Sequence, residues 1–148
     1  MKTIGISMVG SGFMGKLHTL SIGSYPIYYY PSDVQPRLEC IVGHTPQAAQ
    51  EGMKQFGFRR AATDWRTLLT DEKTDVIVIA TPNDLHRQIA IEAIRAGKHV
   101  FCEKPLGLNA QEAYEMYKEA ERMGVVAACG HNNRALAAVR MIKRLMER

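Results

Sequence analysis

A glycine turn between a strand-like segment and a helix-like segment is the feature that most restricts the fold of this chain. Residues 3–9 alternate apolar and small side chains, which is typical of a strand, and residues 13–22 support a helix. A Gly-x-Gly-x-x-Gly turn in that position opens a strand–helix–strand unit of a parallel sheet. The turn consists of Gly10, Ser11, Gly12, Phe13, Met14 and Gly15.

Each glycine of this turn has a physical task that a larger residue performs badly. Gly10 permits the sharp bend after the strand, Gly12 lets the backbone approach a ligand, and Gly15 lets the helix pack closely against the strand. The N-terminus of the helix carries unpaired N–H groups and a partial positive charge, which attract a pyrophosphate. The turn therefore predicts a dinucleotide-binding site.

The rest of the chain repeats the alternation of strand and helix. Further strands are predicted at residues 38–42, 60–63, 75–80, 99–102 and 125–129, and helices at residues 46–56, 65–69, 84–96, 110–123 and 135–146. Residues 23–36 contain three prolines and four tyrosines and are predicted to form an extended surface loop. We therefore expect an α/β fold with a doubly wound, mostly parallel sheet, the Rossmann fold.

Composition limits the class of protein. With 148 residues the chain has the size of one domain, and it has no apolar run near the roughly 20 residues of a membrane helix. No secretory signal precedes the first strand, so we expect a cytoplasmic protein without membrane contact. A basic cluster near the C-terminus is better explained as a solvated helix face than as a nucleic-acid site. That cluster consists of Arg134, Arg140, Lys143, Arg144 and Arg148.

The three cysteines, Cys40, Cys102 and Cys129, lie far apart in apolar segments. They lack the Cys-x-x-Cys spacing of a metal or redox site. We therefore interpret them as buried, reduced thiols and predict no metal site.

The end of the second strand bears on which dinucleotide the turn accepts. In this fold a carboxylate there, about 20 residues after the glycines, binds the adenosine ribose of NAD. Asp33 has that spacing but lies in the proline-rich segment, and the strand ends instead in Gly43, His44 and Thr45. Without the carboxylate the site tolerates a 2′-phosphate, with His44, Thr45 or Arg59 as donors, so the sequence slightly favours NADP. A solvent-exposed turn is the alternative place for His44.

Two polar loops follow the fourth and fifth predicted strands and emerge beside the glycine turn. One is Thr81-Pro82-Asn83-Asp84-Leu85-His86, and the other is Glu103-Lys104-Pro105, preceded by Ala96-Gly97-Lys98-His99-Val100. Through these segments and the glycine turn, nearly the whole chain resembles the glucose-fructose oxidoreductase, inositol dehydrogenase and rhizopine-catabolism (Gfo/Idh/MocA) family. The Glu-Lys-Pro tripeptide is far more distinctive than the glycine turn alone.

The resemblance implies roles for the loop after the fourth strand. Thr81, Pro82 and Asn83 would line the groove for the nicotinamide cofactor, NAD(P). His86 would lie near the nicotinamide end of that groove. Packing against the following helix is the alternative interpretation of His86.

The resemblance also implies the catalytic group. Glu103 would contact the nicotinamide ribose, and Pro105 would follow a cis peptide bond. Lys104 would reach both that ribose and the reacting oxygen of the substrate, where its charge stabilises a developing alkoxide during hydride transfer. The substrate implied by the family is a polyol, a sugar or a related secondary alcohol or ketone. The alternative for both charged residues is a solvated loop position.

A looser match places Asn132 and Arg134 where the chain passes the nicotinamide. Residues 135–138 depart from the family pattern, which continues there with aromatic residues and a proline, so Arg134 has the alternative of anchoring the crossover. We expect a dinucleotide-binding domain over residues 1–130. A crossover segment and helix over residues 131–148 would lead toward a second domain.

The family resemblance implies a chain more than twice this length, whose second domain forms the substrate pocket and supplies a histidine and an aspartate as general-base candidates. We therefore expect this chain to bind cofactor but to turn over little substrate. The last predicted helix carries an apolar face that predicts self-association, hence a homo-oligomer. That face includes Leu136, Val139, Ile142 and Met146.

Two other classes of function remain as alternatives. A methyltransferase also seats S-adenosylmethionine on a glycine turn after its first strand, but the Glu-Lys-Pro tripeptide has no role in such an enzyme. A non-catalytic NAD(P)-sensing module is compatible with a chain that lacks a substrate pocket. Binding of NADPH, NADH and S-adenosylmethionine separates the methyltransferase from the other two classes.

Overall fold

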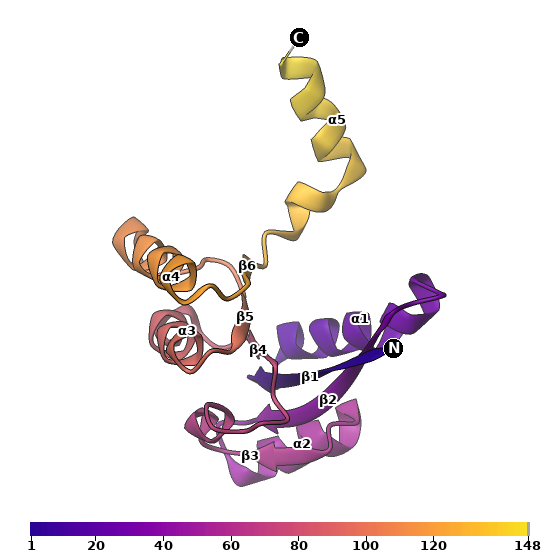
Figure 1. Cartoon of the computed structure of the whole chain (residues 1–148), viewed down its shortest axis with the longest axis vertical. Coiled ribbons are helices and arrows are strands. Elements are labelled where there is room, and N and C mark those ends of the chain that lie inside the picture. The colour runs from indigo at the N-terminus through magenta and orange to yellow at the C-terminus, as the bar shows by residue number, and fades with distance from the viewer. Residues whose placement is uncertain (148) are drawn as a thin grey trace.

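A computed structural model describes residues 1–147 and shows a single parallel sheet of six strands in the order β3-β2-β1-β4-β5-β6 (Figure 1). This order, in which the chain returns to the centre after β3, is that of a doubly wound Rossmann sheet, and it confirms the predicted fold class. The strands are β1 (Lys2–Val9), β2 (Val34–Val42), β3 (Arg60–Ala62), β4 (Val76–Ile79), β5 (His99–Cys102) and β6 (Ala127–Cys129).

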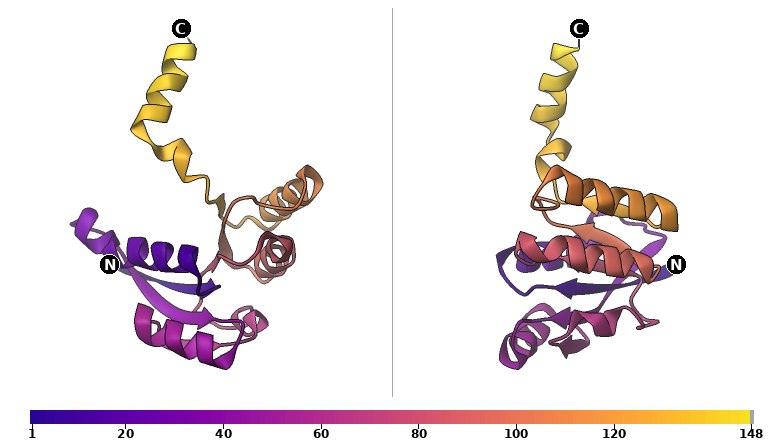
Figure 2. Two further views of the ribbon diagram at one scale, coloured as in Figure 1. Left: turned by 180° about the vertical axis from the view of Figure 1, so that it is seen from behind. Right: turned by 90° about the vertical axis from the view of Figure 1, so that its left-hand side faces the viewer.

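Helices cover both faces of the sheet, and each face has its own apolar cluster. Side chains of α1 and α2 pack on one cluster with Met8 and Ile41, whereas α3 and α4 pack on the other with Ile77 and Ile79. The helices α3 and α4 lie side by side in all views (Figure 2). The helices are α1 (Phe13–Tyr28), α2 (Pro46–Phe56), α3 (His86–Arg95), α4 (Ala110–Met123) and α5 (Ala137–Met146).

Helix α1 is longer than the sequence predicts, so the prediction of an extended loop from residue 23 is wrong. The helix continues through Gly23 and Pro26 to Tyr28. A proline inside a helix removes one hydrogen bond without ending the helix when the next turn still closes. Here Tyr29 N donates to Tyr25 O at 3.0 Å, and the Ser24 hydroxyl donates to Leu20 O at 2.8 Å.

Strand β2 also begins earlier than predicted, at Val34, because it pairs along its whole length with β1. Pro36 is accommodated since β3 pairs only with the last part of β2, from Cys40 onward, which leaves the first part of β2 as an edge. Asp33 lies just before this strand and accepts a hydrogen bond from Lys2 N. It therefore stands at the amino end of the sheet, opposite to the end that bears the glycine turn.

The remaining differences from the predicted elements are small. Short 3-10 turns occupy Trp65–Leu68 and Asn83–Leu85, and another at Asn132–Ala135 separates β6 from α5. Cys40 and Cys102 are buried as predicted. Cys129 is only half-buried, because β6 is an edge strand.

Helix α5 stands away from the sheet in every view (Figures 1 and 2). Its apolar side chains are exposed, and they include Val139, Met141, Ile142, Leu145 and Met146. Arg148, the last member of the predicted basic cluster, lies outside the described residues. Within residues 1–147, no helix is both long enough and apolar enough to cross a bilayer.

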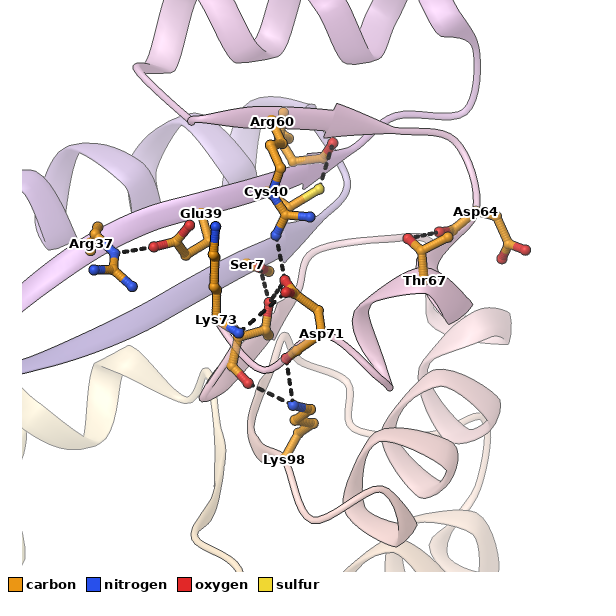
Figure 3. A network of polar contacts seen from close by, with 12 residues as sticks. Ser7, Arg37, Glu39, Cys40, Arg60, Asp64, Thr67, Asp71, Lys73 and Lys98 are labelled. Atoms are coloured by element: carbon orange, nitrogen blue, oxygen red, sulfur yellow. Dashed lines mark hydrogen bonds and ion pairs between the residues drawn. The ribbon is translucent and has the colours of Figure 1, made fainter.

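The amino ends of β3 and β4 are joined by a closed polar network (Figure 3). The Thr74 hydroxyl donates to Asp71 Oδ2 at 2.7 Å and lies 2.7 Å from Ser7 Oγ, and the Arg60 guanidinium pairs with the same carboxylate. Lys98 Nζ donates to the carbonyl oxygens of Asp71 and Thr74. Burial would raise the pKa of Asp71, but its hydrogen bonds, the strongest of them from Thr74, outweigh burial and hold that pKa below its ordinary value.

Candidate functional site

A groove of about 680 Å³ opens at the carboxyl ends of β1, β2 and β4. Its volume is within the range of small-molecule and cofactor sites. In a doubly wound sheet this edge, where the strand order reverses, is the place where ligands bind. The predicted site residues that line the groove are Gly10, Ser11, Gly12, His44, Thr81 and Pro82.

The glycine turn has the backbone that its three glycines permit. Gly10 has φ +106°, and a Cβ atom there would lie 2.5 Å from Ala80 O. At Gly15 a Cβ atom would lie 2.4 Å from Gly10 O, so the helix packs against the turn only without a side chain. Gly12 differs from both, because a Cβ atom there would meet open space. The packing of the described residues therefore does not require a glycine at position 12.

Helix α1 begins at this turn without a side-chain cap. Its N-cap is Gly12, and the first helical hydrogen bond joins Lys16 N to Gly12 O. The N–H groups of Phe13, Met14 and Gly15 therefore have no acceptor within the helix. Helices α2 and α4 are both capped, by the side chains of Thr45 and Asn109.

The Thr81 hydroxyl is a second unsatisfied group at the groove. Its Oγ1 atom is buried and has no hydrogen-bond partner among residues 1–147. A buried hydroxyl without a partner costs about 1–3 kcal/mol, so such groups are rare unless a ligand completes them. The uncapped N-terminus of α1 offers the N–H donors that a pyrophosphate requires, and Thr81 lines the groove beside it, so the residues present fit a dinucleotide.

His86 is buried and is not among the residues that line the groove. Its Nδ1 lies 2.9 Å from Pro105 O and its Nε2 3.0 Å from Thr81 O. The ring thus joins the loop after β4 to the loop after β5 at the start of α3. Asn83, the remaining predicted residue of the first loop, is half-buried in the 3-10 turn that precedes α3.

The Glu-Lys-Pro tripeptide leaves β5 at the same edge of the sheet. Glu103 is buried, and its carboxylate accepts hydrogen bonds from the Lys104 N–H and from His18 on α1. The Lys104 side chain is exposed, and the Lys104–Pro105 peptide bond is cis. A buried carboxylate and an exposed ammonium therefore belong to neighbouring residues at the end of β5.

No carboxylate stands at the end of β2 within the described chain. His44 and Thr45 are exposed there, and the Thr45 hydroxyl oxygen accepts a hydrogen bond from Ala48 N as the cap of α2. Arg59 is exposed just before β3. Of these three residues only His44 lines the groove.

Asn132 and Arg134 are exposed in the turn after β6. Asn132 N donates to Gly130 O at 2.9 Å, and Gly130 packs against the Glu103 carboxylate. This places the turn at the end of the sheet that holds the tripeptide.

Cys102 lies at the end of β5, directly before the tripeptide. Burial raises the pKa of its thiol to about 12, so the thiol is neutral at pH 7.

Sequence patterns did not single out three residues that the structure places at this edge. Thr63 and Trp65 line the groove, and His18 contacts Glu103. Thr63 and Trp65 follow β3, a strand of only three residues, and nothing in their spacing marks a ligand. For His18 a signal exists, since it lies one helical turn after Gly15 and so on the same face of α1.

This edge therefore defines the chain as a dinucleotide-binding domain of the Rossmann type. A family model described as an oxidoreductase family with an NAD-binding Rossmann fold, the Gfo/Idh/MocA family, matches residues 4–131. The chain belongs to this family. The resemblance stated from the glycine turn and the Glu-Lys-Pro tripeptide is thereby confirmed, and so is NAD binding as the character of the domain.

Several characterised proteins are similar to this chain. Levoglucosan dehydrogenase from Pseudarthrobacter phenanthrenivorans is 37% identical over 147 residues, which are 99% of this chain and 38% of that protein. A crystal structure of an NAD binding oxidoreductase from Klebsiella pneumoniae has a TM-score of 0.91 and 36% identity, covering 98% of this chain and 39% of that one. A levoglucosan dehydrogenase complex with NADH and levoglucosan has a TM-score of 0.87 and 37% identity, over 90% of this chain and 36% of that one. The chain thus spans less than two fifths of the length of each.

Proposed function

We propose that this chain binds a nicotinamide dinucleotide across the carboxyl edge of its sheet, with the pyrophosphate on the N-terminus of α1. The single observation that carries the proposal is the uncapped N-terminus of α1, which begins at Gly12 in the lining of the groove that Thr81 also lines. The adenosine half then extends toward His44, and the nicotinamide half toward Glu103. The complexes of related structures with NADH support this assignment.

The reaction proposed for the whole enzyme is hydride transfer between the cofactor and a secondary alcohol or ketone of a sugar or polyol. The bound nicotinamide supplies the hydride acceptor or donor. Lys104, exposed beside the buried Glu103, holds a positive charge at the substrate oxygen, where negative charge develops. Asn132 and Arg134 lie in the turn after β6, next to Gly130, and are proposed to contact the nicotinamide half. The substrate class is supported by the relatives named levoglucosan dehydrogenase and myo-inositol 2-dehydrogenase.

The choice between NAD and NADP rests on the end of β2. His44 and Thr45 stand where NAD-specific sites carry a carboxylate, and neither repels a 2′-phosphate. We propose a slight preference for NADP. A tenfold or greater preference for NAD in measured dissociation constants would contradict it.

Equilibrium titration tests the proposed function. NADH and NADPH should each bind with one site per chain, followed by the nicotinamide fluorescence, and S-adenosylmethionine should not bind. Lys104→Ala should lower catalysis by the whole enzyme by a larger factor than it lowers cofactor affinity, because the charge acts most strongly on the oxygen that becomes negative in the transition state. Binding of S-adenosylmethionine in place of the nicotinamide dinucleotides would favour the methyltransferase instead.

A further inference from the structure

The side chain of His18, on helix α1, contacts the buried carboxylate of Glu103. His18 Nε2 lies 2.7 Å from Glu103 Oε1, although 85 residues separate the two in the chain. The side chain of His18 is 19% exposed and that of Glu103 is 6% exposed. The His18 ring also meets the Phe101 ring edge-on, with 5.0 Å between the ring centroids.

The Glu103 carboxylate is held at each oxygen by one donor. Oε1 faces His18, and Oε2 accepts from Lys104 N at 3.1 Å. Behind it stands Gly130, where a Cβ atom would lie 2.7 Å from Oε1. In the arrangement that positions a carboxylate, Nε2 of His18 is the donor and Oε1 is the acceptor. A buried carboxylate keeps one orientation only while such donors hold it.

Helix α1 thereby contributes to two parts of the proposed cofactor site, the glycine turn and the end of β5. Its uncapped N–H groups, up to Gly15, face the pyrophosphate position, and His18 lies one turn further on. The same rigid element that fixes the phosphate position also fixes the carboxylate at the end of β5.

We propose that His18 is a positioning residue, which orients the Glu103 carboxylate toward the nicotinamide ribose and so sets the affinity for the nicotinamide half of the dinucleotide. This rests on the proposed function, in which Glu103 contacts that ribose. His18 itself does not touch the cofactor in this account. Its loss therefore weakens NADH binding while binding of ADP, which lacks the nicotinamide riboside, is unchanged.

A purely structural role for His18 in packing against Phe101 makes the opposite prediction for two matched variants. His18→Phe keeps an aromatic ring against Phe101 but removes the N–H donor. His18→Gln removes the ring but offers an amide N–H to the carboxylate. Positioning requires that the glutamine variant resemble the wild type, whereas packing requires that the phenylalanine variant do so.

The experiment measures dissociation constants of NADH and ADP for the wild-type chain and both variants. We expect His18→Phe to raise the NADH dissociation constant about tenfold with ADP affinity within twofold, and His18→Gln to stay within threefold for both ligands. Equal NADH affinity in the wild type and His18→Phe would overturn this inference alone. Failure of the wild type to bind NADH would overturn the proposed function, and this inference with it.

A double-variant cycle tests whether His18 acts through Glu103. In a Glu103→Ala background, His18→Phe should cause no further loss of NADH affinity, because the carboxylate that His18 orients is absent. A further loss of threefold or more in that background would show that His18 acts by another route and would overturn the proposal.

Discussion

The polar groups at the two ends of the sheet differ in whether they have hydrogen-bond partners. At the amino ends of β3 and β4, Asp71, Thr74 and Ser7 form a closed network in which each hydroxyl and carboxylate has a partner. At the carboxyl ends, within the described part of the chain, Thr81 Oγ1 is buried without a partner and α1 begins without a side-chain cap.

This difference separates the residues that stabilise the domain from those that bind its ligand. Satisfied buried groups contribute to stability, whereas unsatisfied ones lower it until a ligand completes them. We therefore expect substitutions at the amino end to change the free energy of unfolding and not cofactor affinity. Substitutions at the carboxyl end should change cofactor affinity and leave the free energy of unfolding nearly unchanged.

The largest effect is expected for Gly12→Asp. A side chain meets open space at this position, and aspartate is a favourable N-cap, so the thermal unfolding midpoint should stay equal or rise slightly. The same carboxylate occupies the pyrophosphate position with like charge, and the NADH dissociation constant should rise about 100-fold or more, equivalent to about 2.7 kcal/mol. Gly23→Asp is the matched control, since Gly23 is also open on α1 but remote from the groove. Retained NADH binding in Gly12→Asp would place the pyrophosphate elsewhere.

Asp71→Asn tests the amino end. Losing the charge that pairs with the exposed Arg60 and accepts from the buried Thr74 should lower the free energy of unfolding by about 1 kcal/mol in urea titration at pH 7, with NADH affinity within twofold. The pKa of Asp71 is lowered in the folded state. The contribution of its carboxylate to the free energy of unfolding is therefore complete above the ordinary aspartate pKa, and it is lost as the pH falls through the pKa of the folded state. The difference between wild type and variant should therefore shrink on acidification. Asp64→Asn, in an exposed position of the same connection, should change stability by less than about 0.5 kcal/mol.

His44→Asp tests whether the adenosine ribose lies beside the end of β2. It introduces a carboxylate at the end of β2, where it accepts hydrogen bonds from a ribose and repels a 2′-phosphate. The ratio of NADPH to NADH dissociation constants should increase about tenfold. An unchanged ratio would mean that the adenosine ribose does not lie beside His44.

The smallest effects are expected from a threonine-to-valine substitution, made at each end of the sheet in a separate variant. Thr81→Val removes the unpartnered hydroxyl, so stability should be unchanged or higher while NADH affinity falls about fivefold, the value of one hydrogen bond of about 1 kcal/mol. Thr74→Val removes a hydroxyl with two partners, so stability should fall by about 1–2 kcal/mol while NADH affinity is unchanged. Equal effects of the two variants on both quantities would refute the contrast between the ends.

The order of strands and helices was predictable from the sequence because hydrophobic period and glycine breaks act locally. The length of α1 was not, since Pro26 is a local signal for a helix end and the hydrogen bonds that continue the helix depend on its three-dimensional context. The start of β2 depended on pairing with β1, which is a long-range property.

The glycine turn and the two polar loops were predictable as parts of one site, because parallel strands bring their carboxyl ends to one edge. The partners of those residues were not. His86 joins two carbonyl oxygens from separate loops, and His18 meets Glu103 across 85 positions of sequence. Neither contact follows from spacing, because both depend on how the loops close over the sheet.

The most direct test of the contrast between the two ends is an amide chemical-shift map of the isotope-labelled chain titrated with NADH. We expect the largest shifts at the amides of Gly12, Met14, Thr81 and Lys104, with those of Asp71 and Thr74 unmoved. Shifts concentrated at the amino-end network, or no shifts in a folded chain at millimolar NADH, would contradict the account.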